Sequence, residues 1–331
     1  MNAKWQQLCH TILDPDTQNI LITSHAFPDG DSIASQLALR ALLIQLNKTV
    51  TIYNNDPPPE RYRFLPGSEL IETVFPDQFE PQLLVVLDVV PWERLGRVSS
   101  LHENHYPMVI IDHHVYDEWP EGFYYIDPTK AATAEIIYDL YKELRVPITK
   151  DAAFALFTGL LTDTGRFRFS NTNSNVLRKA ADLIDCGANS EWITREIYFK
   201  RPLNFFKNFA KVIETMQIIP EFRAVICHFT AAMNQGNPIR MEETEDMIEL
   251  INSLKEIDLY IFLKEYKANE FKISFRSRDQ VDGRQIANLL GGGGHKHASG
   301  ARLSGDLAFV KQTVLDAVNR TQAISGRNSS N

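Results

Sequence analysis

The hydrophobic positions in the first half of the chain fall into short runs that are almost continuously apolar and rich in β-branched residues. The runs are Asn19–His25, Thr49–Asn55, Leu83–Val90 and Met108–His114. Strands that are buried on both faces show this pattern. Because neither face meets water, polar residues do not alternate with apolar ones along the strand. The pattern therefore predicts a mostly parallel sheet whose two faces are covered by helices.

Segments with helical spacing separate and follow these runs. The stretch "DSIASQLALRALLIQLN" places Ile33, Leu37, Leu42 and Leu46 where they can form one apolar stripe. Asp31 or Ser32 is predicted as the N-cap of this helix. Ala131–Leu144 and Asp151–Leu161 are predicted as further helices. Strands alternating with helices predict an α/β fold with a doubly wound, mostly parallel sheet.

The second half of the chain has a different pattern. It is helical and charged from about Ala180 to Gln217, and then the strand-like segments "FRAVICHFT", "IDLYIFLKEY" and "EFKISFRSR" follow without regular strand–helix–strand spacing. This predicts a smaller α+β domain. We expect a first domain over 1–190, a helical connector over 191–213, a second domain over 214–320 and a polar, disordered tail over 321–331. Within "YFKRPLNFFKNFAKV", a helix that packs Phe205, Phe206 and Phe209 inward is favoured over a surface for single-stranded nucleic acid.

Composition narrows the class of protein. The chain has 331 residues, of which 44% are hydrophobic and 23% charged, as expected for a two-domain globular protein. No run approaches the roughly 18 consecutive apolar residues of a membrane span, and the N-terminal segment has no signal-peptide core. The three cysteines are far apart in the sequence. These features predict a soluble, cytoplasmic protein without a disulfide framework.

The formal net charge of −8 argues against binding to long duplex nucleic acid, which needs a basic surface. It leaves room for a small anionic ligand in a local positive pocket. No membrane partner is expected.

Acidic and imidazole side chains gather at the polar ends of the predicted strands and of one helix. They are His25, Asp29, Asp31, Asp88, Asp112, His113, His114 and Asp163. The carboxyl ends of parallel strands open onto one crevice, so four separate segments can deliver these groups to a single volume. Taken singly, an aspartate after a strand is an ordinary turn former or N-cap, and a histidine pair is an ordinary surface feature. Four similarly placed clusters favour a shared site over four coincidences.

So many carboxylates in one crevice would repel each other unless cations neutralised them. Aspartate and histidine ligands without cysteine suit Mn²⁺ or Mg²⁺. The candidate groups exceed the needs of one ion and favour a pair of ions about 3.5–4 Å apart, as in phosphoryl hydrolysis.

The motifs "HAFPDGDS", "DHH" and "LLTDTGRF" resemble the DHH phosphoesterase superfamily, and "GGGGHKHASG" resembles its companion DHHA1 domain. The resemblance covers roughly Asn19–Leu303 and keeps the order of the motifs. In size and in the pairing of its domains the chain looks most like the bacterial branch of oligoribonucleases (nano-RNases) that also act as phosphatases on 3′-phosphoadenosine 5′-phosphate (pAp).

The resemblance assigns a role to each side chain. It implies that His25 and Asp29 hold one metal ion, that Asp31, His113 and Asp163 hold the other, and that Asp88 bridges them. It implies that Asp112 orients the histidine pair. It also implies that His114 faces the scissile phosphate, where it stabilises the phosphate or assists the leaving oxygen, and that a water activated by the cations attacks phosphorus.

In the second domain, four successive glycines end at His295. By itself such a run favours a flexible turn, but glycines also let backbone N–H groups approach a phosphate closely. Arginine suits bidentate phosphate recognition, and "SFRSRD" supplies it near this loop in the pattern. The predicted substrate-binding residues are Arg166, Arg276, Ser277, Gly292, Gly293, Gly294, His295 and Ser299. Ala131 and Ala132 stand where relatives often carry serines, which removes hydroxyl contacts and leaves the metal ligands untouched.

The leading hypothesis is a Mn²⁺-dependent phosphodiesterase that degrades RNA of two to five nucleotides and dephosphorylates pAp. The resemblance is compatible with a homodimer. Rival hypotheses are hydrolysis of cyclic dinucleotides or pApA, a RecJ-like exonuclease on single-stranded DNA, an inorganic pyrophosphatase, and a non-catalytic nucleotide-binding protein. The last would be expected to have lost ligands, whereas the full set is present here.

Overall fold

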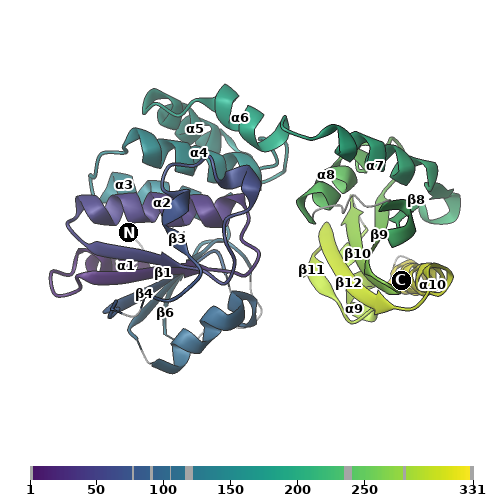
Figure 1. Ribbon diagram of the computed structural model, residues 1–331, viewed down its shortest axis with the longest axis horizontal. Helices are drawn as coiled ribbons and strands as arrows, with labels where there is room; N and C mark the ends of the chain where they lie inside the picture. The colour runs from purple at the N-terminus through teal and green to yellow at the C-terminus, as the bar shows by residue number, and fades with distance from the viewer. Residues whose placement is uncertain are drawn as a thin grey trace. The chain divides into compact units, whose positions relative to one another are not determined.

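The computed structural model describes residues 3–76, 78–89, 92–104, 106–115, 122–234, 241–278 and 281–328. The chain divides into two compact units, Met1–Lys200 and Arg201–Asn331. Each unit is built on its own six-stranded sheet. The predicted fold class, an α/β domain with a doubly wound parallel sheet followed by a smaller α+β domain, is confirmed (Figure 1).

The sheet of the first unit is parallel throughout. Its strands are β1 (Asn19–Ser24), β2 (Thr49–Tyr53), β3 (Ile71–Glu72), β4 (Leu83–Leu87), β5 (Met108–Asp112) and β6 (Phe123–Ile126), in the spatial order β3-β2-β1-β4-β5-β6. Each of the four apolar runs contains one of these strands. The short strands β3 and β6 were not predicted, and Val90, the last residue of the third run, lies outside the described residues.

Both faces of this sheet are buried, which explains the continuous apolar runs. Along β1, Ile20 and Ile22 join the core on one face, and Leu21 joins the core on the other. The first core packs helices onto the sheet: α1 (Ala3–Leu13), α2 (Gly30–Gln45), α3 (Thr133–Glu143), α4 (Lys150–Asp163), α5 (Ser174–Asp185) and α6 (Ser190–Tyr198). The second core packs the 3₁₀ segment η3 (Trp92–Asn104) onto the opposite face. Short 3₁₀ turns η1 (Glu60–Tyr62) and η2 (Ser68–Leu70) follow β2.

The strand order creates the crevice in which ligands bind in folds of this kind. From β1 the chain moves outward to β2 and β3, and then crosses to β4 on the other side of β1 before continuing to β5 and β6. The direction of winding therefore reverses between β1 and β4. A crevice opens at the carboxyl ends of the strands at such a reversal.

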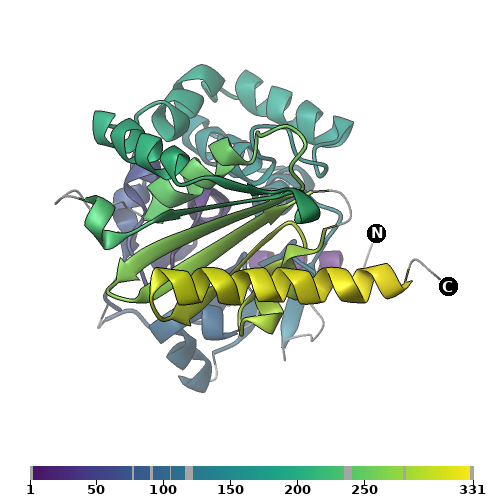
Figure 2. The ribbon, with the colours of Figure 1, turned by 90° about the vertical axis from the view of Figure 1, so that its right-hand side faces the viewer.

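The second unit has a mixed sheet in the order β11-β12-β10-β9-β8-β7. Its strands are β7 (Gln217–Ile219), β8 (Ala224–Phe229), β9 (Leu259–Lys267), β10 (Glu270–Ser277), β11 (Gly293–His295) and β12 (Ala298–Ser304), and only β8 and β9 pair in parallel. Helices α9 (Gly283–Leu289) and α10 (Leu307–Asn328) cover one face, and α7 (Leu203–Glu214) and α8 (Met241–Ile251) cover the other. Figure 2 shows α10 lying across the sheet. The 3₁₀ turns η4 (Pro220–Phe222) and η5 (Ala231–Asn234) flank β8.

Several local expectations differ from the structure. The predicted N-cap of the first long helix was wrong, because α2 begins at Gly30 and the side chain of Asp29 accepts the N–H of Ser32. In α7, Phe205 is buried and Phe209 packs against it, but Phe206 is 54% exposed, so the inward packing predicted for Phe206 was wrong. The predicted connector 191–213 is divided between α6 in the first unit and α7 in the second. The segment predicted as a disordered tail is helical as far as Asn328, and 329–331 lie outside the described residues.

All three cysteines are free thiols. Across the part of the chain that the structure describes, no helix is both long enough and apolar enough to span a bilayer.

Candidate metal centre

The predicted cluster comes together at the crevice of the first unit. His25 follows β1 directly, Asp88 follows β4, and Asp112 ends β5 and is followed by His113 and His114. The helices contribute Asp29 and Asp31 at the start of α2 and Asp163 at the end of α4. Their ligand atoms form three overlapping groups, and within each group they lie within 4.8 Å of one another. The groups are His25–Asp29–Asp88, Asp31–His113–Asp163 and Asp88–Asp112–His113–His114.

In the first group the imidazole of His25 presents Nε2 to two carboxylates. Nε2 lies 3.9 Å from Asp29 Oδ1 and 3.7 Å from Asp88 Oδ2. The other ring nitrogen, Nδ1, lies 2.9 Å from the carbonyl oxygen of Ala26. Because a carbonyl oxygen can only accept a hydrogen bond, Nδ1 carries the proton and Nε2 of the neutral ring carries the lone pair.

In the second group His113 takes the same pose. Its Nδ1 faces the carbonyl oxygen of Lys130 at 3.3 Å. Its Nε2 lies 3.1 Å from Asp163 Oδ2 and 3.9 Å from Asp31 Oδ2. This Nε2 atom is buried, and neither oxygen meets it in a well-aligned hydrogen bond. A buried nitrogen that faces carboxylate oxygens in this way is an arrangement that a cation between them would satisfy.

Asp88 lies between the two groups and offers one oxygen to each. Its Oδ2 faces His25, and its Oδ1 lies 3.8 Å from His113 Nε2. The residue is 2% exposed and has a left-handed backbone, with φ at +61°. Aspartate tolerates this conformation better than most residues do, because its short polar side chain can bond locally.

The N-terminus of α3 holds Asp31. The N-cap of α3, Ala132, has no side chain that can accept a hydrogen bond, and the carboxylate of Asp31 fills that role from α2. Asp31 Oδ2 accepts the N–H of Thr133 at 2.6 Å, and Asp31 Oδ1 accepts the N–H of Ala134 at 2.9 Å. The space is tight, since a Cβ on Gly159 would lie 2.8 Å from Asp31 Oδ1. Glycine at 159 therefore lets α4 pack against this contact.

Sequence reasoning missed Thr133, which also positions Asp88. Its hydroxyl donates to Asp88 Oδ1 at 3.0 Å, and it is fully buried. One residue at the start of α3 thus fixes a carboxylate from each of two other segments. The available sequence signal was a helix start without a capping residue, which indicates that another segment must supply the cap.

An ion-pair network around the buried Glu135 and Lys179, also missed, fixes the loop that precedes α3. Glu135 Oε2 accepts the N–H of Ala131 at 2.8 Å, and Glu135 Oε1 pairs with Lys179 at 2.8 Å. Asp139 lies 2.6 Å from Lys179 and 2.7 Å from Lys130. Because the carbonyl oxygen of Lys130 faces His113, this network orients the imidazole of His113 indirectly.

Asp112 contacts both members of the histidine pair. This fully buried carboxylate accepts the N–H groups of His113 and His114 at 2.6 and 3.1 Å through Oδ1. The same oxygen lies 2.8 Å from His114 Nδ1. His114 is therefore held with its proton on Nδ1.

The electrostatics of the cluster favour positive charge. Burial raises the pKa of Asp31 well above its usual range, and the nearby carboxylates of Asp88 and Asp163 raise it further. Burial lowers the pKa of His25, but the carboxylates of Asp29 and Asp88 outweigh it and raise the pKa to about 10. Burial likewise lowers the pKa of His113, and Asp163 and its neighbours raise it to about 11. Such groups are neutralised either by protons or by cations, and the aspartate and histidine donors suit a divalent metal.

The residues predicted to bind substrate in the second unit lie on neighbouring strands. Arg276 and Ser277 end β10, and the β11 glycines pair with β12, so that Gly293 faces Gly300 and Gly294 faces Ser299. Ser299 is buried and its hydroxyl has no hydrogen-bond partner. The backbone of His295 pairs with Ala298.

The glycine run also has a structural role, independent of any ligand. The N–H of Gly292 donates to Ala287 at 2.8 Å and ends helix α9. A Cβ on Gly292 would lie 2.1 Å from the carbonyl oxygen of Gly300, and Gly294 has φ at +130°. Glycine is therefore required for the close approach of β11 and β12. A role of these residues in substrate binding stays a prediction.

Arg166 lies in the first unit, three residues after Asp163. Its backbone is left-handed, with φ at +64°, and its guanidinium packs over the ring of Tyr198 at 4.5 Å. It lines a pocket that none of the other predicted site residues lines.

Each of the two units matches the model of a known protein family. The model of the DHH family, N-terminal domain, matches residues 19–160, and the model of the DHHA1 domain matches residues 228–323.

The chain is similar to the bifunctional oligoribonuclease and PAP phosphatase NrnA of Thermus thermophilus. The two are 35% identical over 300 residues, which cover 90% of this chain and 89% of the relative. It is also 25% identical over 304 residues to the protein of the same name from Bacillus subtilis, covering 90% of this chain and 92% of the relative.

Two solved structures share the fold. An exopolyphosphatase-related protein from Bacteroides fragilis matches with a TM-score of 0.89 and 23% identity, covering 97% of both chains. RecJ in complex with Mn²⁺ from Thermus thermophilus matches with a TM-score of 0.58 and 13% identity, covering 96% of this chain and 55% of the other.

Proposed function

The chain belongs to the DHH/DHHA1 family of phosphoesterases, and from that premise we propose that it degrades RNA of two to five nucleotides to mononucleotides and removes the 3′-phosphate of pAp. The similarity to the NrnA proteins over nine tenths of the chain supports this choice of substrates. The net charge of −8 also suits a short substrate bound in a pocket better than a long nucleic acid.

The observation that carries the proposal is the position of Asp88. Its two oxygens face two histidines that belong to separate Asp/His groups. One shared carboxylate between two ligand sets is the arrangement expected of a site for two cations.

We assign the ligands accordingly. His25 and Asp29 would hold one ion, Asp31, His113 and Asp163 would hold the other, and Asp88 would contact both. The donor set suits Mn²⁺, with Mg²⁺ as the alternative, and RecJ structures are solved with either ion. When bound, the two cations neutralise phosphate charge and lower the pKa of a water molecule.

The protein's own groups then position the reaction. Asp112 holds the Nδ1 proton of His114 and fixes the plane of its ring, so that the Nε2 edge is presented in a constant direction. A histidine held in this way is suited to stabilise the phosphate or to assist the oxygen that leaves phosphorus. In the second unit, Arg276 with Ser277, the β11 glycines and Ser299 are assigned to the terminal phosphate and its nucleotide.

A turnover panel with purified protein and Mn²⁺ tests the proposal. It contains 5′-phosphorylated RNA from two to seven nucleotides, pAp, pApA, cyclic di-AMP and pyrophosphate. We expect turnover of pAp and of RNA of two to five nucleotides, falling for longer RNA. Preference for pApA or cyclic di-AMP would move the protein to cyclic-dinucleotide turnover. Calorimetric titration with Mn²⁺ separates an enzyme from a binder, because binding of the metal without turnover of any substrate would contradict the proposal.

A further inference from the structure

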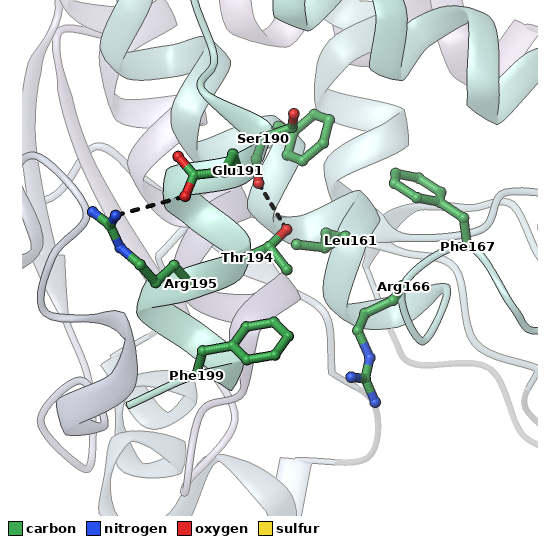
Figure 3. Close-up of a pocket in the computed structure, with 9 residues that line it drawn as sticks. Leu161, Arg166, Phe167, Ser190, Glu191, Thr194, Arg195 and Phe199 are labelled. Atoms are coloured by element: carbon green, nitrogen blue, oxygen red, sulfur yellow. Dashed lines mark hydrogen bonds and ion pairs between the residues drawn. The ribbon is translucent and has the colours of Figure 1, made fainter. Parts of the chain in front are cut away.

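A pocket of about 680 Å³ lies in the first unit between α4, α6 and the turn that follows α4. It is lined by Phe157, Leu161, Arg166, Phe167, Ser190, Glu191, Thr194, Arg195 and Phe199. In Figure 3 the Arg166 guanidinium and the Phe199 ring flank the lower part of the pocket, below Leu161 and Thr194. Its volume is in the range of sites for small organic ligands.

The turn that forms one wall is strained. Gly165, Arg166 and Phe167 have φ values of +54°, +64° and +60°, so three successive residues adopt the left-handed conformation. For a residue with a side chain, this conformation brings Cβ too close to the following carbonyl oxygen. A run of this kind persists only where its surroundings hold it, and it points to a functional constraint.

The surroundings do hold the turn. The fully buried Thr164 accepts the N–H of Phe167 with its hydroxyl at 3.0 Å, and its carbonyl oxygen accepts the N–H groups of Arg168 and Phe169. The ring of Phe169 lies over Gly165, where a Cβ would come within 2.4 Å of it. The result is that the side chains of two adjacent residues, Arg166 and Phe167, both line the pocket.

The lining has the chemistry of a site for an aromatic anion. Three phenylalanine rings surround the pocket, and one of them, Phe199, is 71% exposed to solvent. The stack on Tyr198 holds the plane of the Arg166 guanidinium. Arg195 pairs with Glu191 at 3.6 Å on the surface, and an exposed pair of this kind is weak enough for Arg195 to turn to a ligand phosphate. Aromatic rings next to arginine recognise nucleobases and their phosphates in single strands.

The pocket is tied to the metal centre by α4. This helix contributes Phe157 and Leu161 to the pocket and ends at Asp163 in the metal cluster. Arg166 is the third residue after Asp163, so their Cα atoms are at most about 11 Å apart. A short oligonucleotide is long enough to span that distance.

We propose that this pocket binds the base of a further nucleotide of the RNA substrate, beyond the nucleotide assigned to the second unit. This rests on the proposed function. Stacking against Phe199 and Phe167 and contact of Arg166 with the adjoining phosphate then favour a substrate of at least two nucleotides over pAp, which has a single base.

The experiment compares Phe199→Ala with Phe206→Ala in the full-length chain. Phe206 is a matched control because it is also an exposed phenylalanine, at 54%, and does not line the pocket. In Phe199→Ala we expect the ratio of KM for a 5′-phosphorylated RNA trimer to KM for pAp to rise roughly tenfold, as for loss of one stacked base. In Phe206→Ala the ratio should stay at the wild-type value. Equal changes for both substrates, or none, would overturn the proposal.

A second experiment measures binding alone, so that failure of the pocket proposal can be distinguished from failure of the proposed function. The affinity for pApA is measured calorimetrically with EDTA present, so that no turnover occurs. The affinity should fall roughly tenfold in Phe199→Ala and in Arg166→Gln, and should be unchanged in Phe206→Ala. Wild-type affinity in both pocket variants overturns the pocket even if the chain degrades RNA. Absence of turnover by the wild type refutes the function, while the affinities still decide whether the pocket binds the base.

Discussion

The two units of this protein use sheets of the same size in opposite ways. In the parallel sheet of the first unit, the candidate site residues follow the strand ends or lie at helix ends, and the structure gathers their side chains from segments more than a hundred residues apart. In the mixed sheet of the second unit, they lie within a local antiparallel hairpin and its neighbour β10. A parallel sheet thus concentrates side chains from distant segments, whereas the hairpin brings backbones together.

The two candidate sites also differ in the interactions that fix their residues in place. In the first unit the carboxylates of Asp31, Asp88 and Asp112 are buried and bonded to backbone N–H groups, a hydroxyl and a histidine. In the second unit the requirement is the absence of side chains, since Gly292 and Gly294 permit close contact with β12. Substitutions in the first site should therefore act on charge and metal affinity, and those in the second on substrate affinity.

The largest effect is expected at Asp88. Asp88→Asn keeps a residue that tolerates the left-handed backbone but removes the charge shared by the two ligand groups. We expect turnover to fall by at least about a hundredfold, with calorimetry showing weaker Mn²⁺ binding and no loss of thermal stability. Asp185→Asn, at an exposed position at the end of α5, is the control. Wild-type turnover in Asp88→Asn would refute the bridging assignment.

The buried network behind the first site should matter for stability. Lys179→Met leaves Glu135 buried without its closest cationic partner, and we expect the free energy of unfolding to fall by about 3 kcal/mol. Lys142→Met removes an ion pair of similar length, 2.7 Å to Asp182, that is exposed, so its effect should stay under about 1 kcal/mol. Urea denaturation measures both. Equal effects would show that burial of the network does not matter.

Arg276→Ala tests the other side of the comparison. We expect KM for 5′-phosphorylated RNA to rise about thirtyfold, as for loss of a charged hydrogen bond, while Mn²⁺ affinity is unchanged. The same RNA without its 5′-phosphate should be affected little. Arg302→Ala, an exposed arginine on β12, serves as the control. An equal rise in KM with and without the 5′-phosphate would contradict the assignment.

The smallest effect is expected from Thr133→Val, which removes only the hydroxyl that donates to Asp88 and keeps the shape of the side chain. Mn²⁺ affinity should fall about tenfold. Thr158→Val is matched, because that buried hydroxyl donates within its own helix, to Phe154. If both variants bind Mn²⁺ as the wild type does, the contact from α3 has no part in tuning the site.

The parts of this structure that could be predicted from the sequence are those set by continuous patterns. The four long strands and the gathering of groups such as His25, Asp88 and His113 followed from apolar runs that end in polar residues. Strands β3 and β6 were not predicted because they are short; β3 has only two residues and β6 only four. A run of that length carries no periodicity.

The missed features depend on contacts between segments that are remote in sequence. Nothing local marks Thr133 as the partner of Asp88, or Lys179 as the partner of Glu135, 44 residues away. The left-handed turn at Arg166 and Phe167 could not be predicted from the sequence either, because neither residue type favours that conformation. Phe206 was misplaced because helical spacing alone could not decide which of two adjacent phenylalanines faces inward.

The cap that Asp31 supplies to α3 has a consequence for the order of events after synthesis. Both oxygens of this carboxylate are already bonded to N–H groups of the protein, so its position is fixed by folding and needs no ion. In small zinc domains, by contrast, the ligands come together only when the metal binds. This chain is therefore expected to fold first and to load its cations later. Its fold should survive a period in which metal is scarce, and activity should return as soon as metal is supplied, without refolding.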